Sequence, residues 1–122
     1  MFIPFLVSKI HNAVVTGANL NYSGSISIDA DIMEKARLRQ FQKVEIYNIS
    51  NGKRFSTYVI TGESGTGTIE LNGAAARMVS LDDKIIIAAY ALLDERELNS
   101  LSSVILIMKE NNEVERIITG KL

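Results

Sequence analysis

Short runs of β-branched and aromatic residues, separated by Gly, Asn, Asp and Ser, recur along most of the chain. This pattern is typical of β-strands, because such side chains fit a pleated sheet and the intervening residues favour turns. It predicts seven strands, at residues 13–16, 25–28, 43–48, 54–60, 68–71, 84–90 and 103–108.

Two turn signals stand between these strands. Asn51 followed by Gly52 readily adopts the positive φ angles of a tight turn, so the strands at 43–48 and 54–60 are predicted to form a hairpin. The glycine-rich segment 62–67 lacks the Lys and Ser/Thr of a phosphate-binding loop. It is interpreted as a flexible turn within a hairpin.

Helical spacing is confined to short segments. Apolar residues recur at helical intervals within 32–36, behind Asp29 or Asp31, either of which suits an N-cap. Segments 73–78 and 94–99 are predicted to form a turn or two each. Many short strands with few helices predict a mainly β fold, a small closed barrel, because closure removes exposed strand edges.

Composition narrows the class of protein. A chain of 122 residues, 47% apolar and 22% charged, is predicted to form one domain, residues 1–122, around a packed core. A domain this small leaves much of its surface in water, which favours oligomerisation. The net charge of −1, with no run of like charges, excludes the electrostatic footprint of a nucleic-acid or anionic-lipid partner.

The absence of cysteine and the single histidine limit the available chemistry. No metal site is expected, because carboxylates alone would have to supply the ligands. No apolar run approaches the roughly 20 residues that cross a bilayer, and no signal peptide is expected at the amino terminus. A cytoplasmic location is predicted, in keeping with the lack of disulfides.

The segment 54–58 carries the strongest candidate for carboxylate binding. Alternation along a strand places Arg54, Ser56 and Tyr58 on one side, and Phe55 and Thr57 on the other. A guanidinium beside a phenol suits a carboxylate ligand, since the planar fork matches two oxygens. The alternative is a solvated outer face of a hairpin.

Gly24 before Ser25 is a weaker signal with specific chemical potential. Glycine permits strained backbone geometry, and a hydroxyl beside a distorted peptide carbonyl can attack it. His11 is either a partner for a serine or an ordinary structural residue.

Four segments resemble the aspartate α-decarboxylase family: residues 8–11 (Ser-Lys-Ile-His), 22–25 (Tyr-Ser-Gly-Ser), 51–58 (Asn-Gly-Lys-Arg-Phe-Ser-Thr-Tyr) and 72–76 (Asn-Gly-Ala-Ala-Ala). Their order and spacing also fit. The resemblance covers roughly residues 6–93 and fades beyond them. Tyr47 stands where a tryptophan is often found.

The resemblance implies a double-psi β-barrel, assembled as a homotetramer with active sites between adjacent subunits. It also implies self-processing, in which the Ser25 hydroxyl attacks the Gly24 carbonyl and the chain is cut into residues 1–24 and 25–122. Position 25 would become a pyruvoyl group, so that neither a metal nor pyridoxal phosphate is needed. The implied activity is that of a lyase, converting L-aspartate to β-alanine and CO₂ for pantothenate and coenzyme A biosynthesis.

The resemblance also implies roles for individual residues. Arg54, helped by Lys9, would bind the side-chain carboxylate of aspartate, and Tyr58 would donate a proton to the substrate carbanion. Thr57 would act in substrate binding and, near the Gly24 carbonyl, in processing. The remaining implied site residues are Asn72, Gly73, Ala74 and Ala75, in a substrate and processing loop, and Tyr22 and His11, around the scissile bond.

Two alternatives remain at this point. One is a non-catalytic or unprocessed double-psi barrel that acts as a binding or scaffold domain, since a fold alone does not imply catalysis. The other is a hydrolase that uses Ser25 with His11, for which the sequence offers no identifiable acidic partner.

Overall fold

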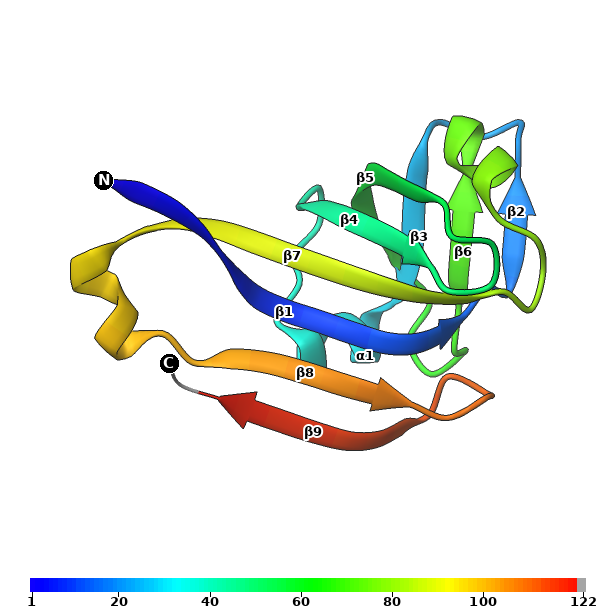
Figure 1. The fold of residues 1–122 in the computed structure, drawn as a ribbon. Helices are drawn as coiled ribbons and strands as arrows, with labels where there is room; N and C mark the ends of the chain where they lie inside the picture. The colour runs from blue at the N-terminus through cyan, green and yellow to red at the C-terminus, as the bar shows by residue number, and fades with distance from the viewer. Residues whose placement is uncertain (121–122) are drawn as a thin grey trace.

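Nine strands form one continuous sheet in the computed structural model, which describes residues 1–120 (Figure 1). Their order across the sheet is β2-β6-β3-β5-β4-β7-β1-β8-β9. The elements are β1 (Phe2–Val14), β2 (Gly17–Asn19), β3 (Ser25–Asp29), α1 (Ala30–Ala36), β4 (Lys43–Asn48), β5 (Arg54–Gly62), β6 (Ile69–Asn72), η1 (Gly73–Met78), β7 (Lys84–Asp94), η2 (Glu95–Ser100), β8 (Ser103–Met108) and β9 (Val114–Gly120).

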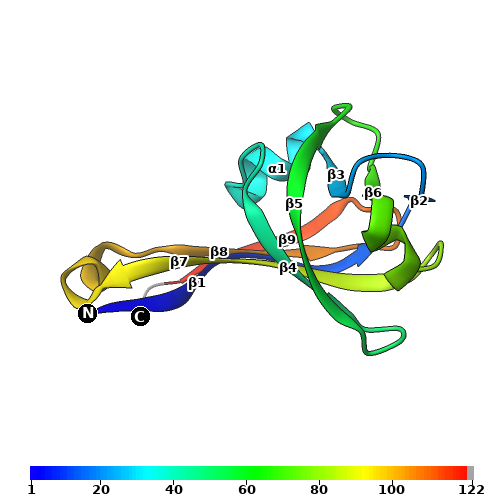
Figure 2. The ribbon, with the colours of Figure 1, turned by 90° about the horizontal axis from the view of Figure 1, so that it is seen from above.

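The sheet curls into a small barrel. β2 stands at one end of the strand order, beside β6, whereas β1 lies toward the opposite end, between β7 and β8. Only Val15 and Thr16 separate β1 from β2 along the chain, so these two distant parts of the sheet are held close together. The Thr16 amide also donates to the Ile69 carbonyl, 2.8 Å away. This chain connection links the two ends of the run from β6 to β1 (Figure 2). The prediction of a mainly β fold with short helices is confirmed.

The barrel is filled by branched aliphatic side chains that alternate with outward-facing residues along the strands. In β4, for example, Val44, Ile46 and Asn48 are buried while the residues between them are partly or fully exposed. The largest fully buried side chains are Ile10, Ile26, Ile28, Ile46, Ile69, Leu71, Ile85, Ile87, Leu106, Val15, Val44 and Val59.

Three strands differ from the sequence prediction. The expected strand at 13–16 is the end of β1, which begins at Phe2 and was missed because its apolar residues do not alternate. β2 has only three residues and was also missed. β9 was not predicted because most of its residues are exposed, so no buried face marks it in the sequence. β9 is held in the sheet by its backbone pairing with β8.

The turn and helix predictions are largely confirmed. β4 and β5 form the expected antiparallel hairpin. Within its turn Gly52 has a φ of 78°, whereas Asn51 does not adopt a positive φ. Asp29 is the N-cap of α1. The short helices η1 and η2 lie where 73–78 and 94–99 were predicted, and no helix within residues 1–120 is long and apolar enough to cross a membrane.

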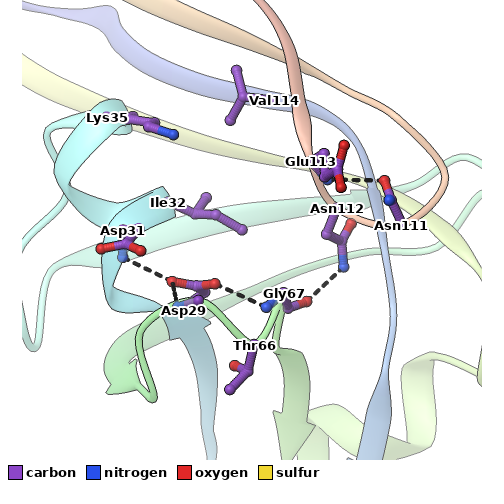
Figure 3. Close-up of a pocket in the computed structure, with 11 residues that line it drawn as sticks. Asp29, Asp31, Ile32, Lys35, Thr66, Gly67, Asn111, Asn112, Glu113 and Val114 are labelled. Carbon is purple, nitrogen blue, oxygen red and sulfur yellow. Dashed lines mark hydrogen bonds between the residues drawn. The ribbon is translucent and has the colours of Figure 1, made fainter.

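The segment 62–67 contains a turn, as predicted, but it does not belong to a hairpin, which corrects the sequence interpretation. It connects β5 to β6, which are separated in the sheet by β3. The buried Asp29 carboxylate accepts hydrogen bonds from the amides of Gly67 (2.8 Å), Gly65 (3.2 Å) and Asp31 (2.8 Å). These bonds hold the loop against the start of α1 (Figure 3).

Asn112 extends this network to the tip of the β8–β9 hairpin. Its side chain donates to the carbonyls of Val14 and Gly67 and accepts from the Val14 amide, each at 2.8 Å. The hollow of about 380 Å³ beside these residues contains none of the predicted catalytic or substrate-binding residues. Its polar groups hold three chain segments together at one end of the barrel (Figure 3).

The Asp29 network predicts a pH-dependent contribution to stability. Burial alone would raise the pKa of Asp29, but the hydrogen bonds from the amides of Gly67, Asp31, Gly65 and Ile32 lower it below its usual value. A lowered folded-state pKa stabilises the fold above the unfolded pKa of about 3.9, and this stabilisation is lost as pH falls through the folded value.

Asp29→Asn is therefore expected to reduce the free energy of unfolding by about 2–3 kcal/mol at neutral pH. The difference from the unmodified protein should shrink below about pH 4, as measured by chemical denaturation at several pH values. The control Asp31→Asn removes an exposed carboxylate from the same helix turn and should cost less than about 1 kcal/mol. An effect of Asp29→Asn that is independent of pH would contradict the assigned role of the carboxylate.

Candidate active site

Ser25 begins β3 and is buried, with 5% of its surface exposed. Its Oγ accepts a hydrogen bond from Asn72 Nδ2 at 3.0 Å and donates to the Ser23 carbonyl at 3.3 Å. The same Asn72 amide group donates to Ser27 Oγ at 3.1 Å. The Ser25 hydroxyl is thus held in place by β6, the strand beside it.

The segment before Ser25 packs directly on Gly73. Gly73 has a φ of 65°, and a Cβ placed on it would lie 2.6 Å from the Gly24 nitrogen and 2.9 Å from the Tyr22 carbonyl oxygen. Gly24 itself has neither a positive φ nor a close neighbour at its Cβ position. Position 73, where the two backbones approach, is therefore the position that requires glycine, whereas the φ of Gly24 is one that other residues also adopt.

A cavity of about 440 Å³ opens beside Gly24. The β3–β5 ladder begins with Ile26 opposite Val59, so Gly24 and Ser25 lie level with Thr57 and Tyr58. The cavity thereby brings together five of the predicted site residues. It is lined by Gly24, Phe55, Ser56, Thr57, Tyr58, Ala74, Ala75 and Met78.

The alternation predicted along β5 is confirmed. Arg54, Ser56 and Tyr58 are exposed, whereas Phe55 and Thr57 are half-buried. Arg54, however, does not line the cavity beside Gly24. It lies at the start of β5 and borders a separate hollow of about 300 Å³ with Tyr47 and Ile86.

Lys9 lies on the same face of the sheet as Arg54. A row of paired residues connects the two strands: Lys9 in β1 pairs with Ala88 in β7, and Ala88 pairs with Glu45 in β4. Glu45 in turn pairs with Ser56 in β5, two residues from Arg54. Residues paired in this way point to one face. Arg54 and Lys9 therefore lie on one face of the sheet, but neither borders the cavity beside Gly24.

Tyr22 and His11 are placed differently from one another. Tyr22 is 62% exposed, and its backbone carbonyl oxygen lies 2.9 Å from the position of a Cβ at Gly73. His11 pairs with Ile107 of β8, and its Nδ1 is buried without a hydrogen-bond partner. Burial and the charge of Lys9 lower the pKa of His11, so the imidazole is neutral at neutral pH. Within residues 1–120 no hydrogen bond joins His11 to a serine, which gives the hydrolase alternative no support.

The arrangement around Ser25 is suited to an attack on the backbone by its own hydroxyl. Asn72 Nδ2 and the Ser23 carbonyl fix the orientation of Ser25 Oγ, one residue after Gly24, and small side chains at positions 74 and 75 border the cavity beside Gly24. Asn72 Oδ1 is buried and has no partner, so a hydrogen-bond acceptor is free near Ser25. In the part of the chain described, no group of three His, Asp or Glu side chains is placed to hold a metal ion.

Two side-chain hydrogen bonds near the predicted site residues were not expected from the sequence. Ser27 shares the Asn72 amide with Ser25, which only the β3–β6 register reveals. Tyr90 bonds Tyr47 through their hydroxyls, 2.9 Å apart. A lone tyrosine within the apolar run of β7 is the one sequence signal that marks Tyr90.

Comparison with known proteins adds a family context. The family model described as aspartate decarboxylase matches residues 1–115. A curated aspartate 1-decarboxylase from Sulfurimonas denitrificans is 55% identical over 118 residues, which is 97% of this chain and 98% of that protein.

Two other curated proteins of the same name are similar over comparable lengths. The one from Wolinella succinogenes is 55% identical, covering 96% of this chain and 97% of its own length. The one from Caldicellulosiruptor saccharolyticus is 52% identical, covering 96% and 91%. The similarity therefore continues well past residue 93, where the four motifs alone had indicated that it fades.

Proposed function

Because the chain belongs to the aspartate decarboxylase family, we propose that it is a lyase that converts L-aspartate to β-alanine and CO₂. We propose further that it uses a pyruvoyl group made from its own Ser25. The observation that carries this proposal is a set of three contacts: Gly73 packs against Gly24, Asn72 Nδ2 donates to Ser25 Oγ, and Gly24 borders a cavity together with Thr57 and Tyr58.

Self-processing begins with attack of Ser25 Oγ on the Gly24 carbonyl carbon, which moves the acyl group from nitrogen to oxygen and gives an ester. Loss of the Ser25 α-proton and departure of the Gly24 carboxylate then break the chain and leave dehydroalanine. Water replaces the nitrogen, which leaves as ammonia, and a ketone remains. The products are residues 1–24, and residues 25–122 with a pyruvoyl group at position 25.

Two residues near Gly24 and Ser25 support these steps. Asn72 holds the attacking oxygen, and Thr57 borders the cavity together with Gly24, where its hydroxyl serves the Gly24 carbonyl as negative charge develops there. The close contact between Gly73 and Gly24 fixes the segment that must turn toward the hydroxyl.

The residues around position 25 also fit the pyruvoyl group itself. When formed, the group supplies an electron sink for the pair left on the α-carbon after CO₂ departs, which no ordinary side chain provides. The free acceptor Asn72 Oδ1 suits the substrate amine, and the cavity beside Ala74 and Ala75 has room for the substrate. Tyr58, which borders the same cavity, donates the proton that replaces the lost carboxylate.

Arg54 binds the side-chain carboxylate of aspartate, the one that is retained. A strong cation at the departing carboxylate would stabilise the ground state and raise the barrier. In residues 1–120 Arg54 makes no ion pair, since the one salt bridge joins Arg96 to Asp94. Its guanidinium is therefore available to a ligand, and Lys9 adds positive charge on the same face.

The separation of these two groups supports an active site shared between subunits. Gly24, Thr57 and Tyr58 border one hollow, while Arg54 borders another. In the proposed homotetramer, Arg54 and Lys9 of one subunit complete the cavity of its neighbour. Exposed apolar residues beyond the barrel, including Phe2 (66%) and Leu92 (68%), supply surface for such contacts. The β-alanine produced would serve pantothenate synthesis.

Gly73→Ala tests the proposed processing geometry. A methyl group there would sit 2.6 Å from the Gly24 nitrogen, on a backbone whose φ of 65° disfavours side chains. Strain of about 1–3 kcal/mol should slow cleavage by about five- to 150-fold. The measurement is the fraction of cut chain over time on a denaturing gel.

The matched control is Gly120→Ala, because a Cβ at Gly120 meets no atom within 4 Å. This variant should be cleaved at the normal rate. Normal cleavage of Gly73→Ala, in protein that keeps its thermal stability, would show that the contact with Gly24 has no part in processing.

A further inference from the structure

Tyr47, Arg54 and Tyr90 form a connected cluster on the outer face of the sheet. Tyr47 lies opposite Arg54 in β5 and opposite Ile86 in β7. The Arg54 guanidinium carbon lies 4.3 Å from the centre of the Tyr47 ring, and the Tyr47 hydroxyl lies 2.9 Å from that of Tyr90. The three side chains thus form a chain of contacts that ends at the guanidinium.

The Tyr47–Tyr90 bond spans an unusual distance along the sheet. Tyr90 follows Ile86 by four residues, so its Cα lies about 13 Å along β7 from the residue opposite Tyr47. The two rings must lean toward each other to meet. Ala88, between Ile86 and Tyr90 on the same face, is small and buried, which leaves room for this arrangement.

A neighbouring acid is kept away from Arg54. Glu45 lies two residues from Tyr47 on the same strand face and is the one acidic residue of β4. Both of its carboxylate oxygens accept from Ser56 Oγ, at 2.7 and 2.8 Å. The Tyr47 ring is therefore the partner that the structure gives to the Arg54 charge.

We propose that Tyr90 is a positioning residue for Arg54, because its hydroxyl fixes the Tyr47 ring on which the guanidinium rests. The inference depends on the proposed function of Arg54 in binding the retained carboxylate. Tyr90 does not touch the substrate. It acts by keeping the cation–π partner of Arg54 in one orientation, so that less freedom is lost when the carboxylate binds.

The ionisation of Tyr47 agrees with this geometry. The pKa of Tyr47 is raised to about 12, chiefly by the hydrogen bond with the Tyr90 hydroxyl and by burial. The negative charges of Tyr90 and Glu45 raise it further, while the positive charge of Arg54 lowers it. The phenol therefore stays protonated throughout the neutral range and keeps its bond to Tyr90. Loss of the Tyr90 hydroxyl should lower the pKa of Tyr47.

The test compares Tyr90→Phe, Tyr47→Phe and the double variant, each processed and corrected for the fraction of cleaved chain. Arg54 holds the retained carboxylate before and during reaction, so weaker positioning should appear in binding rather than in the chemical step. Each single variant should raise the KM for aspartate about three- to tenfold, with kcat within about twofold.

Three further measurements sharpen the comparison. The Kd of succinate, a dicarboxylate without the reacting amine, should rise by the same factor as KM. The double variant should match either single variant, because each of the three variants removes the same hydrogen bond between Tyr47 and Tyr90. Ultraviolet titration should show Tyr47 ionising at lower pH in Tyr90→Phe. Thr119→Val, which removes an exposed hydroxyl from β9, is the control and should leave all values unchanged.

Unchanged KM and succinate Kd in both single variants would overturn the inference, as would independent, multiplying effects in the double variant. A fall in kcat with normal KM would also overturn it. These outcomes differ from failure of the proposed function, in which the unmodified protein itself fails to decarboxylate aspartate. The succinate titration would still test the positioning of Arg54 in that case.

Discussion

Ser25→Ala is expected to remain a single uncut chain and to lose aspartate turnover by more than about 10⁴-fold. Alanine has no hydroxyl to attack the Gly24 carbonyl, so neither the cut nor the ketone can form. Alanine is smaller than serine, and Asn72 Nδ2 keeps its bond to Ser27 Oγ, so the fold should persist. The measurements are a denaturing gel and the release of CO₂ from aspartate.

Ser23→Ala is the matched control for this variant. Ser23 accepts from the Ser25 hydroxyl through its backbone carbonyl, which the substitution keeps, and its own side chain is exposed. The control should be cut and active. Turnover by uncut Ser25→Ala would mean that a different group serves as the electron sink.

Arg54→Ala is expected to cut itself normally yet lose kcat/KM for aspartate by about 10²- to 10³-fold. The loss follows because the charge that binds the retained carboxylate is gone, while the cavity around Gly24 and Thr57 is untouched. Steady-state kinetics and the fraction of cut chain, measured on the same sample, separate the two functions.

Arg39→Ala removes an exposed arginine from the turn before β4 and serves as the control. It should match the unmodified protein in both measurements. If Arg54→Ala turned over aspartate normally, the proposed carboxylate clamp would be wrong, and Lys9 would be the next residue to test on that face.

Local sequence patterns predicted the part of the site that lies along one strand. The alternation of residues 54–58 follows from strand geometry alone, and the exposed and half-buried positions agree with it. The short helix after Asn72 and the N-cap at Asp29 also depend on neighbours in the sequence. These features needed no knowledge of distant contacts.

Features that depend on distant contacts were not predictable in the same way. The contact of Gly73 with Gly24 joins residues far apart in the chain and is set by the β3–β6 pairing. The separate hollows that Arg54 and Gly24 border depend on the pairing of β5 with β3 on one side and with β4 on the other, which no local pattern gives. β9 has an exposed surface on both faces and is ordered by pairing with β8, so its hydrophobic pattern carries no signal.

Conversion of Ser25 to a pyruvoyl group by cleavage after Gly24 can be seen in the intact mass of the purified, unmodified protein. We expect two fragments, residues 1–24 and residues 25–122. The larger fragment should have the mass of a ketone at position 25 and should resist Edman degradation, because it has no free amino group. A single full-length species after prolonged warm incubation would show that Ser25 is not converted and would favour an unprocessed barrel.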